Sequence, residues 1–81
     1  MATRAATQIA LTVGGNIRAA REEQGLTQKQ VGDELGVTNR DVSRWENGAV
    51  EPGPKYRHAL ADLLFGGDLS ALYREPEKAA A

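Results

Sequence analysis

The stretch that most constrains the fold of this chain is residues 27–48, TQKQVGDELGVTNRDVSRWENG. It contains two threonines, and each is followed three positions later by a residue with a side-chain acceptor: Thr27 by Gln30, and Thr38 by Asp41. This spacing is typical of the capping box, in which the two side chains satisfy free backbone amides at the start of a helix. The pattern therefore predicts two short helices in close succession.

The apolar residues of this stretch indicate how the two helices pack. Val31 and Leu35 lie at helical spacing in the first helix, and Val42 and Trp45 do so in the second. Gly36 ends the first helix, because glycine adopts the left-handed conformation of a helix end without steric cost. Two capped helices around one glycine are the layout of a helix-turn-helix.

Three further helices are expected around this pair. One is predicted over residues 13–24 after a cap at Thr12, although Ile9 and Val13 fall in step with Ile17 and also allow an earlier start. Another is predicted over residues 54–65, with proline in its first turn. A short fifth helix is predicted over residues 69–74, capped by Asp68. No segment shows the alternation of a strand, so the expected fold class is all-α, a compact domain of five short helices.

Length and composition limit the number of domains and the kinds of site that this chain can have. The 81 residues suffice for one small domain, which we place at residues 12–74, after a flexible N-terminal arm (1–11) and before a disordered tail (75–81). Cysteine is absent, so no disulfide and no thiolate metal site is expected. There is no apolar run of membrane-spanning length and no signal-peptide pattern, and we expect a cytoplasmic protein without membrane partners.

The distribution of charge matters more than the formal net charge of −1. The charged residues of the second motif helix are Arg40, Asp41, Arg44 and Glu46. If Asp41 serves the cap and Glu46 turns inward, the outer face of this helix is net basic. Arg21 lies on the inward stripe of the first predicted helix, where an arginine needs a carboxylate partner, and Glu46 is the natural candidate.

The outer face of the second motif helix carries the chemistry expected of a DNA reader. It holds Asn39, Arg40, Ser43, Arg44 and Asn47. An α-helix fits the major groove of DNA, where asparagine pairs well with the adenine edge and the planar fork of arginine with the guanine edge. The alternative is a polar face that is merely solvated. The complete two-helix pattern favours the DNA hypothesis.

Catalysis has little support in the sequence. The single histidine, His58, stands alone, and no nucleophile–base pair or phosphate-binding loop can be assembled. One histidine and no cysteine cannot make a closed metal site. We therefore expect no enzymatic activity, no cofactor and no metal.

From about Val13 to Leu72 the chain resembles the helix-turn-helix family of lambda-type phage repressors, Cro proteins and the xenobiotic-response-element regulators of bacteria. The motifs that carry the resemblance are Asn16-Ile17-Arg18 with Arg21, Gly25-Leu26-Thr27-Gln28, Gly36-Val37-Thr38, and Val42-Ser43-Arg44-Trp45-Glu46-Asn47-Gly48 followed by Pro52. The resemblance implies a five-helix domain of a bacterium or phage that binds a two-fold symmetric double-stranded DNA operator as a homodimer.

The resemblance also implies roles for individual residues. The base-reading positions are Asn39, Arg40, Ser43 and Arg44; the contacts to phosphate or backbone are Gln28, Thr38, Asn47 and Lys55. Arg21 and Glu46 match the family's structural ion pair, in agreement with the argument from burial.

Two positions depart from the family pattern. Gly32 stands where alanine is usual, at the crossing of the two motif helices, where it fits but costs about 1 kcal/mol of helix stability. The loop after Gly48 is often basic in the family, but here it is Ala49, Val50 and Glu51, so binding to the DNA backbone is expected to be weak and sensitive to salt.

An apolar group near the C-terminal end has two interpretations. Phe65, Leu69, Leu72 and Tyr73 either form an exposed patch for dimerisation or close the small core. We keep both open.

The leading functional hypothesis is a sequence-specific transcriptional regulator, a repressor, which reads the major groove with the helix that follows Thr38. The alternative is an antitoxin or adaptor that uses the same fold to bind a protein partner, such as a toxin or a transcription factor. The near-neutral charge and Glu51 in the loop favour this alternative more than a strongly basic chain would.

Overall fold

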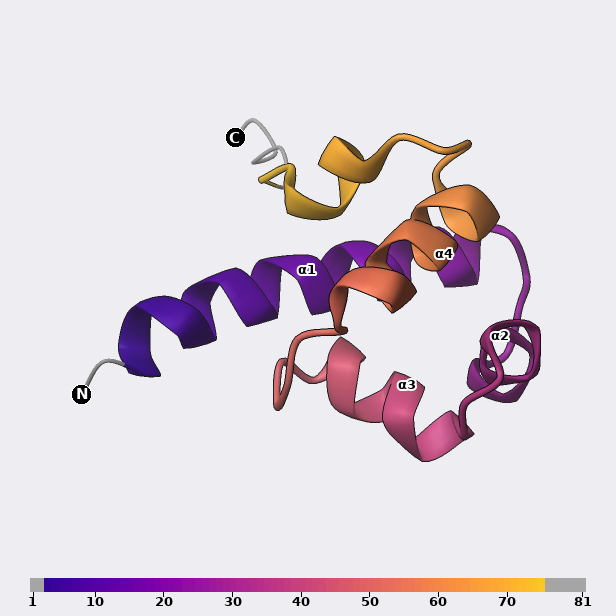
Figure 1. Ribbon diagram of the computed structural model, residues 1–81, viewed down its shortest axis with the longest axis horizontal. Coiled ribbons are helices and arrows are strands. Elements are labelled where there is room, and N and C mark those ends of the chain that lie inside the picture. Colours follow the sequence, from indigo (N-terminus) through magenta and orange to yellow (C-terminus); the bar gives the residue numbers. More distant parts are fainter. Residues whose placement is uncertain (1–2, 76–81) are drawn as a thin grey trace.

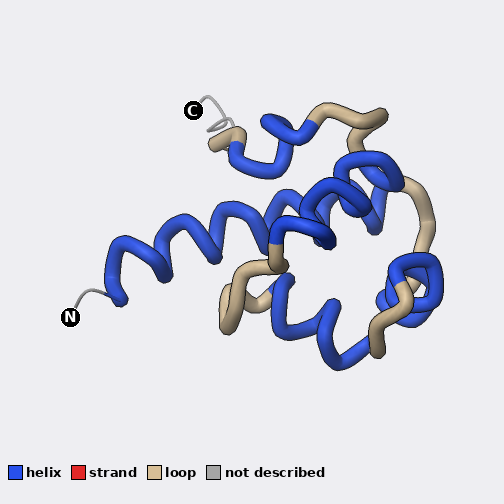
Figure 2. The backbone as a smooth tube through the Cα atoms, viewed as in Figure 1, coloured by secondary structure: helices blue, strands red, loops and turns tan. Residues whose placement is uncertain are grey.

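The computed structural model describes the backbone of residues 3–75 and the side chains from residue 8 onward. The elements are α1 (Thr3–Glu23), α2 (Gln28–Leu35), α3 (Asn39–Glu46), α4 (Pro54–Leu64) and the 3-10 helix η1 (Leu69–Tyr73) (Figure 1). Over this range there are no strands (Figure 2), so the all-α class is confirmed. Four α-helices and one 3-10 helix replace the five predicted helices. No helix of the described range is both long and apolar enough to cross a membrane.

Helix α1 begins earlier than predicted. The expected cap at Thr12 is wrong, because the helix already runs from Thr3 through that position. The preceding residues are mostly good helix formers, and Ala10 extends the buried stripe of Val13 and Ile17 toward the N-terminus. The flexibility expected of residues 1–11 stays a prediction, and residues 1–2 lie outside the described part.

The two capping boxes are confirmed. The Thr27 hydroxyl accepts from the Gln30 amide at 3.0 Å, and the Gln30 side chain accepts from the Thr27 amide at 2.8 Å. Thr38 and Asp41 make the same two bonds at 3.1 and 3.2 Å. Gly36 ends α2 in the left-handed conformation, with φ of +76°. Local sequence therefore sets both ends of the turn between α2 and α3.

The core lies where the four α-helices and η1 meet. Its buried members are Val13, Ile17, Val31, Val42, Trp45, Leu60, Leu64 and Leu72. Leu72 is fully buried, so it cannot belong to the exposed dimerisation patch that was one of the two interpretations. Phe65 and Leu69 are half-buried against the core, whereas Tyr73 remains exposed. The apolar group near the C-terminal end is thus split between core and surface.

The predicted fifth helix is the 3-10 helix η1. Asp68 caps it as expected, since its carboxylate accepts from the Ser70 amide at 3.1 Å. That bond and the Ser70 hydroxyl hold the pKa of Asp68 below its usual value. From α1, the Asn16 side chain donates to the carbonyls of Leu72 and Arg74, both at 2.8 Å. These bonds tie the C-terminal end of η1 to α1. Of the predicted tail, residues 76–81 lie outside the described part.

Helix α1 and the end of α3 approach so closely that their backbones touch. A methyl group on Gly14 would overlap the carbonyl oxygen of Trp45 and lie 2.8 Å from that of Glu46. One turn away, the Leu11 side chain covers Gly48, whose φ is +76°. The absence of a side chain at Gly14 is therefore what lets α1 hold the C-terminal end of α3.

Gly32 marks a second close approach, between α2 and the turn that follows it. A Cβ atom there would lie 2.8 Å from the carbonyl oxygen of Val37 and 3.2 Å from that of Thr38. Glycine therefore fits at this crossing, whereas the methyl group of alanine would crowd the backbone of the turn. The turn sits closer to α2 than a methyl group allows.

We expect Gly32→Ala to lower the free energy of unfolding by about 1 kcal/mol. Moving a packed backbone costs about 1–3 kcal/mol, and the gain of about 1 kcal/mol in helix propensity offsets only part of it. Urea denaturation of the two proteins measures the difference. An increase in stability would show that the turn moves away from α2 at no cost.

Candidate nucleic-acid interface

Helix α3 has one buried and one exposed face. Val42 and Trp45 turn into the core, and α1 and α2 pack against this side (Figure 1). The predicted base-reading residues lie on the other side: Asn39, Arg40 and Arg44 are exposed, and Ser43 is half-buried. Asn47, predicted to contact the DNA backbone, is exposed at the C-terminal end of the helix. The structure thus brings the predicted base-reading side chains onto one continuous surface.

The charge of this surface depends on where the two acidic residues of α3 lie and what they bind. Asp41 accepts from the Thr38 amide at the cap. Glu46 is buried, with 2% of its side chain exposed. In the described range Arg40 and Arg44 make no ion pair. The outer face of α3 is therefore basic although the whole chain carries a formal net charge of −1.

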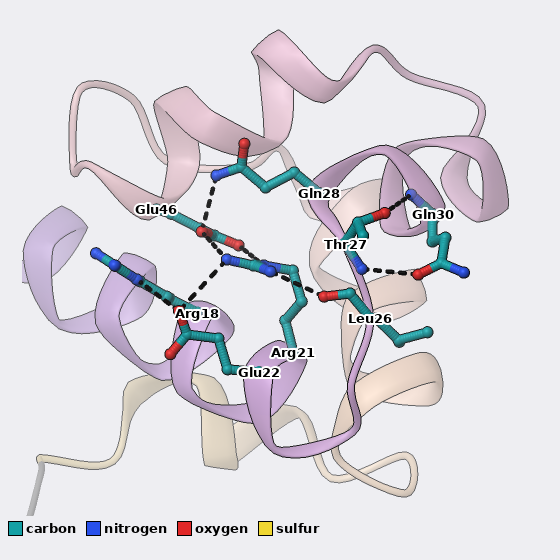
Figure 3. A network of polar contacts seen from close by, with 8 residues as sticks. All are labelled: Arg18, Arg21, Glu22, Leu26, Thr27, Gln28, Gln30 and Glu46. Atoms are coloured by element: carbon teal, nitrogen blue, oxygen red, sulfur yellow. Dashed lines mark hydrogen bonds and ion pairs between the residues drawn. The ribbon is translucent and has the colours of Figure 1, made fainter.

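The predicted ion pair between Arg21 and Glu46 is present and bidentate (Figure 3). Arg21 Nε donates to Glu46 Oε2 at 2.6 Å, and Nη2 donates to Oε1 at 3.0 Å. The third guanidinium nitrogen, Nη1, donates to the Leu26 carbonyl at 2.8 Å. The hydrogen bond with Glu46 raises the pKa of Arg21 above its ordinary value. This pair joins α1, the loop before α2, and α3, and so sets the position of the reading helix.

Gln28, predicted to contact a phosphate, also joins this network. Its Nε2 donates to Glu46 Oε1 at 3.0 Å, beside the bond from Arg21 (Figure 3). An amide nitrogen carries two hydrogens, so one donor is engaged and the second is left for a ligand. Glu46 consequently fixes which way the amide of Gln28 faces.

The remaining predicted backbone contacts lie around α3. Lys55 is exposed near the start of α4, with its Nζ 5.3 Å from the centre of the Tyr56 ring. The Thr38 side chain is exposed at the start of α3, where its hydroxyl accepts from the Asp41 amide. The loop between α3 and α4 carries no basic residue. The predicted backbone contacts therefore lie at helix ends, and this loop offers no cation.

Two structural residues were not assigned from the sequence. Asn16 was noted only as part of a motif, but its side chain ties η1 to α1. Gly14 was given no role, but it permits the contact between α1 and α3. The signal for Gly14 was the presence of glycine inside a helix, which costs stability and so indicates a packing reason.

Within residues 3–75, no group of three or more potential metal ligands lies close together.

The fold and this surface define a helix-turn-helix domain. Residues 17–67 match the family model described as helix-turn-helix. The chain therefore belongs to the helix-turn-helix family of the lambda-repressor and Cro type.

Several curated proteins are similar over most of this chain. Repressor protein C2 of Salmonella phage P22 is 35% identical over 65 residues, covering 72% of this chain and 30% of that protein. The HTH-type transcriptional regulator DicA of Escherichia coli (strain K12) is 32% identical over 68 residues, covering 84% and 50%. The mycobacterial cidal antitoxin MbcA of Mycobacterium tuberculosis (strain ATCC 25618 / H37Rv) is 36% identical over 63 residues, covering 78% and 52%.

The match thus spans about half the length of DicA and MbcA, and less than a third of repressor protein C2. No solved structure matches the chain.

Proposed function

We propose that this protein is a sequence-specific DNA-binding transcriptional regulator that acts as a repressor. The observation that carries the proposal is the outer face of α3, where both arginines are exposed while both acids are used elsewhere. The names of two relatives, a phage repressor and a transcriptional regulator, support the same class.

In the proposed complex α3 lies in the major groove. Arg40 and Arg44 have the planar donor fork that matches the O6 and N7 acceptors of guanine. Asn39, in the first turn, suits adenine, and Ser43 lies between the arginines. Gln28, Thr38, Asn47 and Lys55 hold the DNA backbone. The second amide hydrogen of Gln28 supplies its phosphate contact.

The proposed functional unit is a homodimer on a two-fold symmetric operator. An eight-residue helix such as α3 reaches only a few base pairs. Two copies related by a two-fold axis double the number of contacts, and their half-sites lie one helical turn, or about 34 Å, apart.

Base reading and backbone binding should respond differently to substitution. We expect Arg44→Ala and Arg40→Ala to lose about 1–3 kcal/mol of discrimination at particular base pairs. Gln28→Ala should weaken binding to all sequences alike. Selection of bound fragments from random DNA, followed by titration of the selected sites, measures both effects.

The matched control for this test is Lys29→Ala, because Lys29 is an exposed cation of α2 that already pairs with Asp33 at 3.0 Å. It should change neither sequence preference nor thermal stability. Unchanged operator selection after both arginine substitutions would contradict the assignment.

A second candidate is an antitoxin or an adaptor that binds a protein partner, and the similarity to the antitoxin MbcA favours it. The same selection from random DNA separates the two functions. A two-fold symmetric consensus supports the regulator. If no sequence is enriched at low or moderate salt, while a partner co-purifies in stoichiometric amounts, the second candidate is favoured.

A further inference from the structure

The N-terminal half of α1 extends past the other helices (Figure 1). In the described part, four large apolar side chains are well exposed: Ile9, Leu11, Val50 and Tyr73. Ile9 and Tyr73 line one groove of about 310 Å³ together with Gln8, Thr12 and Glu75. This groove, between α1 and η1, is called the α1–η1 groove below.

One wall of the α1–η1 groove is held in place. Arg57 of α4 donates to the Tyr73 hydroxyl at 2.6 Å. The bond anchors the polar end of the tyrosine on the body of the protein, while 37% of the residue remains exposed. A wall that is already fixed loses little side-chain freedom when another surface packs against it.

The charge of α1 indicates what kind of surface fits there. Charged residues make up 26% of the chain, yet residues 5–17 contain none. In a two-fold symmetric interface the same patch meets itself, so charges near the axis face like charges. The uncharged α1 wall of the groove avoids that repulsion, whereas Glu75 on the other wall carries a charge that has to lie away from the axis. A strongly charged partner, in contrast, would find no complementary charge on the α1 wall.

We propose that the α1–η1 groove is the surface on which a second copy of this chain docks, with the segments of the two α1 helices around Ile9 packed across a two-fold axis. The proposal rests on the dimer of the proposed function and gives it an interface. Of the four residues first considered for dimerisation, it retains Tyr73 and excludes Leu72, which is buried within one chain.

The test is sedimentation equilibrium of the full chain without DNA, over a range of concentrations. We expect the unsubstituted chain to dimerise, and Ile9→Glu to weaken dimerisation by about tenfold or more, because the dimer would bury an unpaired carboxylate. Tyr73→Ala should also weaken dimerisation, because it removes the side chain that forms the other wall of the α1–η1 groove.

Val50→Glu is the matched control. Val50 is as exposed as Ile9 but lines a separate hollow beside Trp45 and Tyr56. This variant should dimerise like the unsubstituted chain. Circular dichroism and thermal melting check that each variant is folded. A folded Ile9→Glu variant that dimerises normally would overturn the proposal.

Other occupants of the groove give different results. If the unsubstituted chain is monomeric and a chain ending at Glu75 dimerises, residues 76–81 occupy the groove and the proposal fails. A chain that is monomeric in both forms also overturns the proposal.

A second measurement, the binding of the folded Ile9→Glu variant to a single half-site, separates the interface from the proposed function. Loss of dimerisation with retained base preference confirms the interface, whereas absence of base preference in every variant refutes the proposed function instead.

Discussion

Replacement of Gly14 by alanine is expected to lower the free energy of unfolding by about 2 kcal/mol or more. The new methyl group would overlap the Trp45 carbonyl oxygen and crowd that of Glu46. Both obstacles are backbone atoms at the end of α3, so they cannot move aside as a flexible side chain would. The two helices must separate, and the contacts of Val13 and Ile17 with the core loosen. A melting temperature about 10 °C lower is expected for a domain of this size.

The adjacent glycine provides the control. Gly15 lies in the same helix, and a methyl group there would meet nothing within 4 Å. Gly15→Ala should therefore stabilise the protein by about 0.5–1 kcal/mol through helix propensity alone. Denaturation curves of the two variants isolate the effect of the contact with α3. Equal gains for both substitutions would mean that α1 and α3 do not approach as closely as described.

Replacement of Glu46 by alanine is expected to cost about 3–5 kcal/mol, the largest effect of any substitution considered. Arg21, with 12% of its side chain exposed, would lose both of its hydrogen bonds to Glu46 and be left with the longer ion pair to the exposed Glu22, at 3.8 Å. Gln28 would lose its acceptor as well. For a chain of 81 residues this loss is comparable to the whole stability, so the variant should be partly unfolded at room temperature.

Two further variants separate this effect from a general effect of charge. Asp33→Ala removes an exposed carboxylate that pairs with Lys29 at 3.0 Å, away from Arg21, and should cost less than about 1 kcal/mol. The double variant Arg21→Ala, Glu46→Ala should be more stable than the sum of the two single effects predicts, because no unpaired charge remains. Additive losses would show that the pair is not coupled.

The loss of Glu46 should also weaken DNA binding. Glu46 fixes the amide of Gln28 and ties α3 to α1, so its removal changes both a proposed phosphate contact and the placement of the reading helix. The double variant Arg21→Ala, Glu46→Ala should therefore be more stable than the two single effects predict but should still bind DNA weakly. The ion pair thus connects the stability of the domain to its proposed function.

Most of the fold could be predicted because its signals are local. The capping boxes at Thr27 and Thr38 and the glycine end at Gly36 each depend on residues within one turn of helix. The outward side of α3 follows from the spacing of Val42 and Trp45. The sequence by itself therefore determined the motif, its buried and exposed faces, and the residues on its outer surface.

The partner of Arg21 was predictable for a different reason. A long charged side chain on an inward stripe must find an opposite charge, and Glu46, on the inner side of the second motif helix, was the natural candidate. The start of α1 was less predictable. Thr12 has the chemistry of a cap, but the burial of Ala10 and the helix formers before it continue the helix through this residue.

Only the tertiary structure decided the close approaches and the fate of the C-terminal apolar residues. That Gly14 touches the end of α3, that Leu72 is buried, and that Gln28 faces Glu46 all depend on the distance between elements far apart in the chain. Periodicity reports which face of a helix is apolar but not how near its neighbour lies. That distance is set by the packing of the whole core, in which every side-chain volume counts.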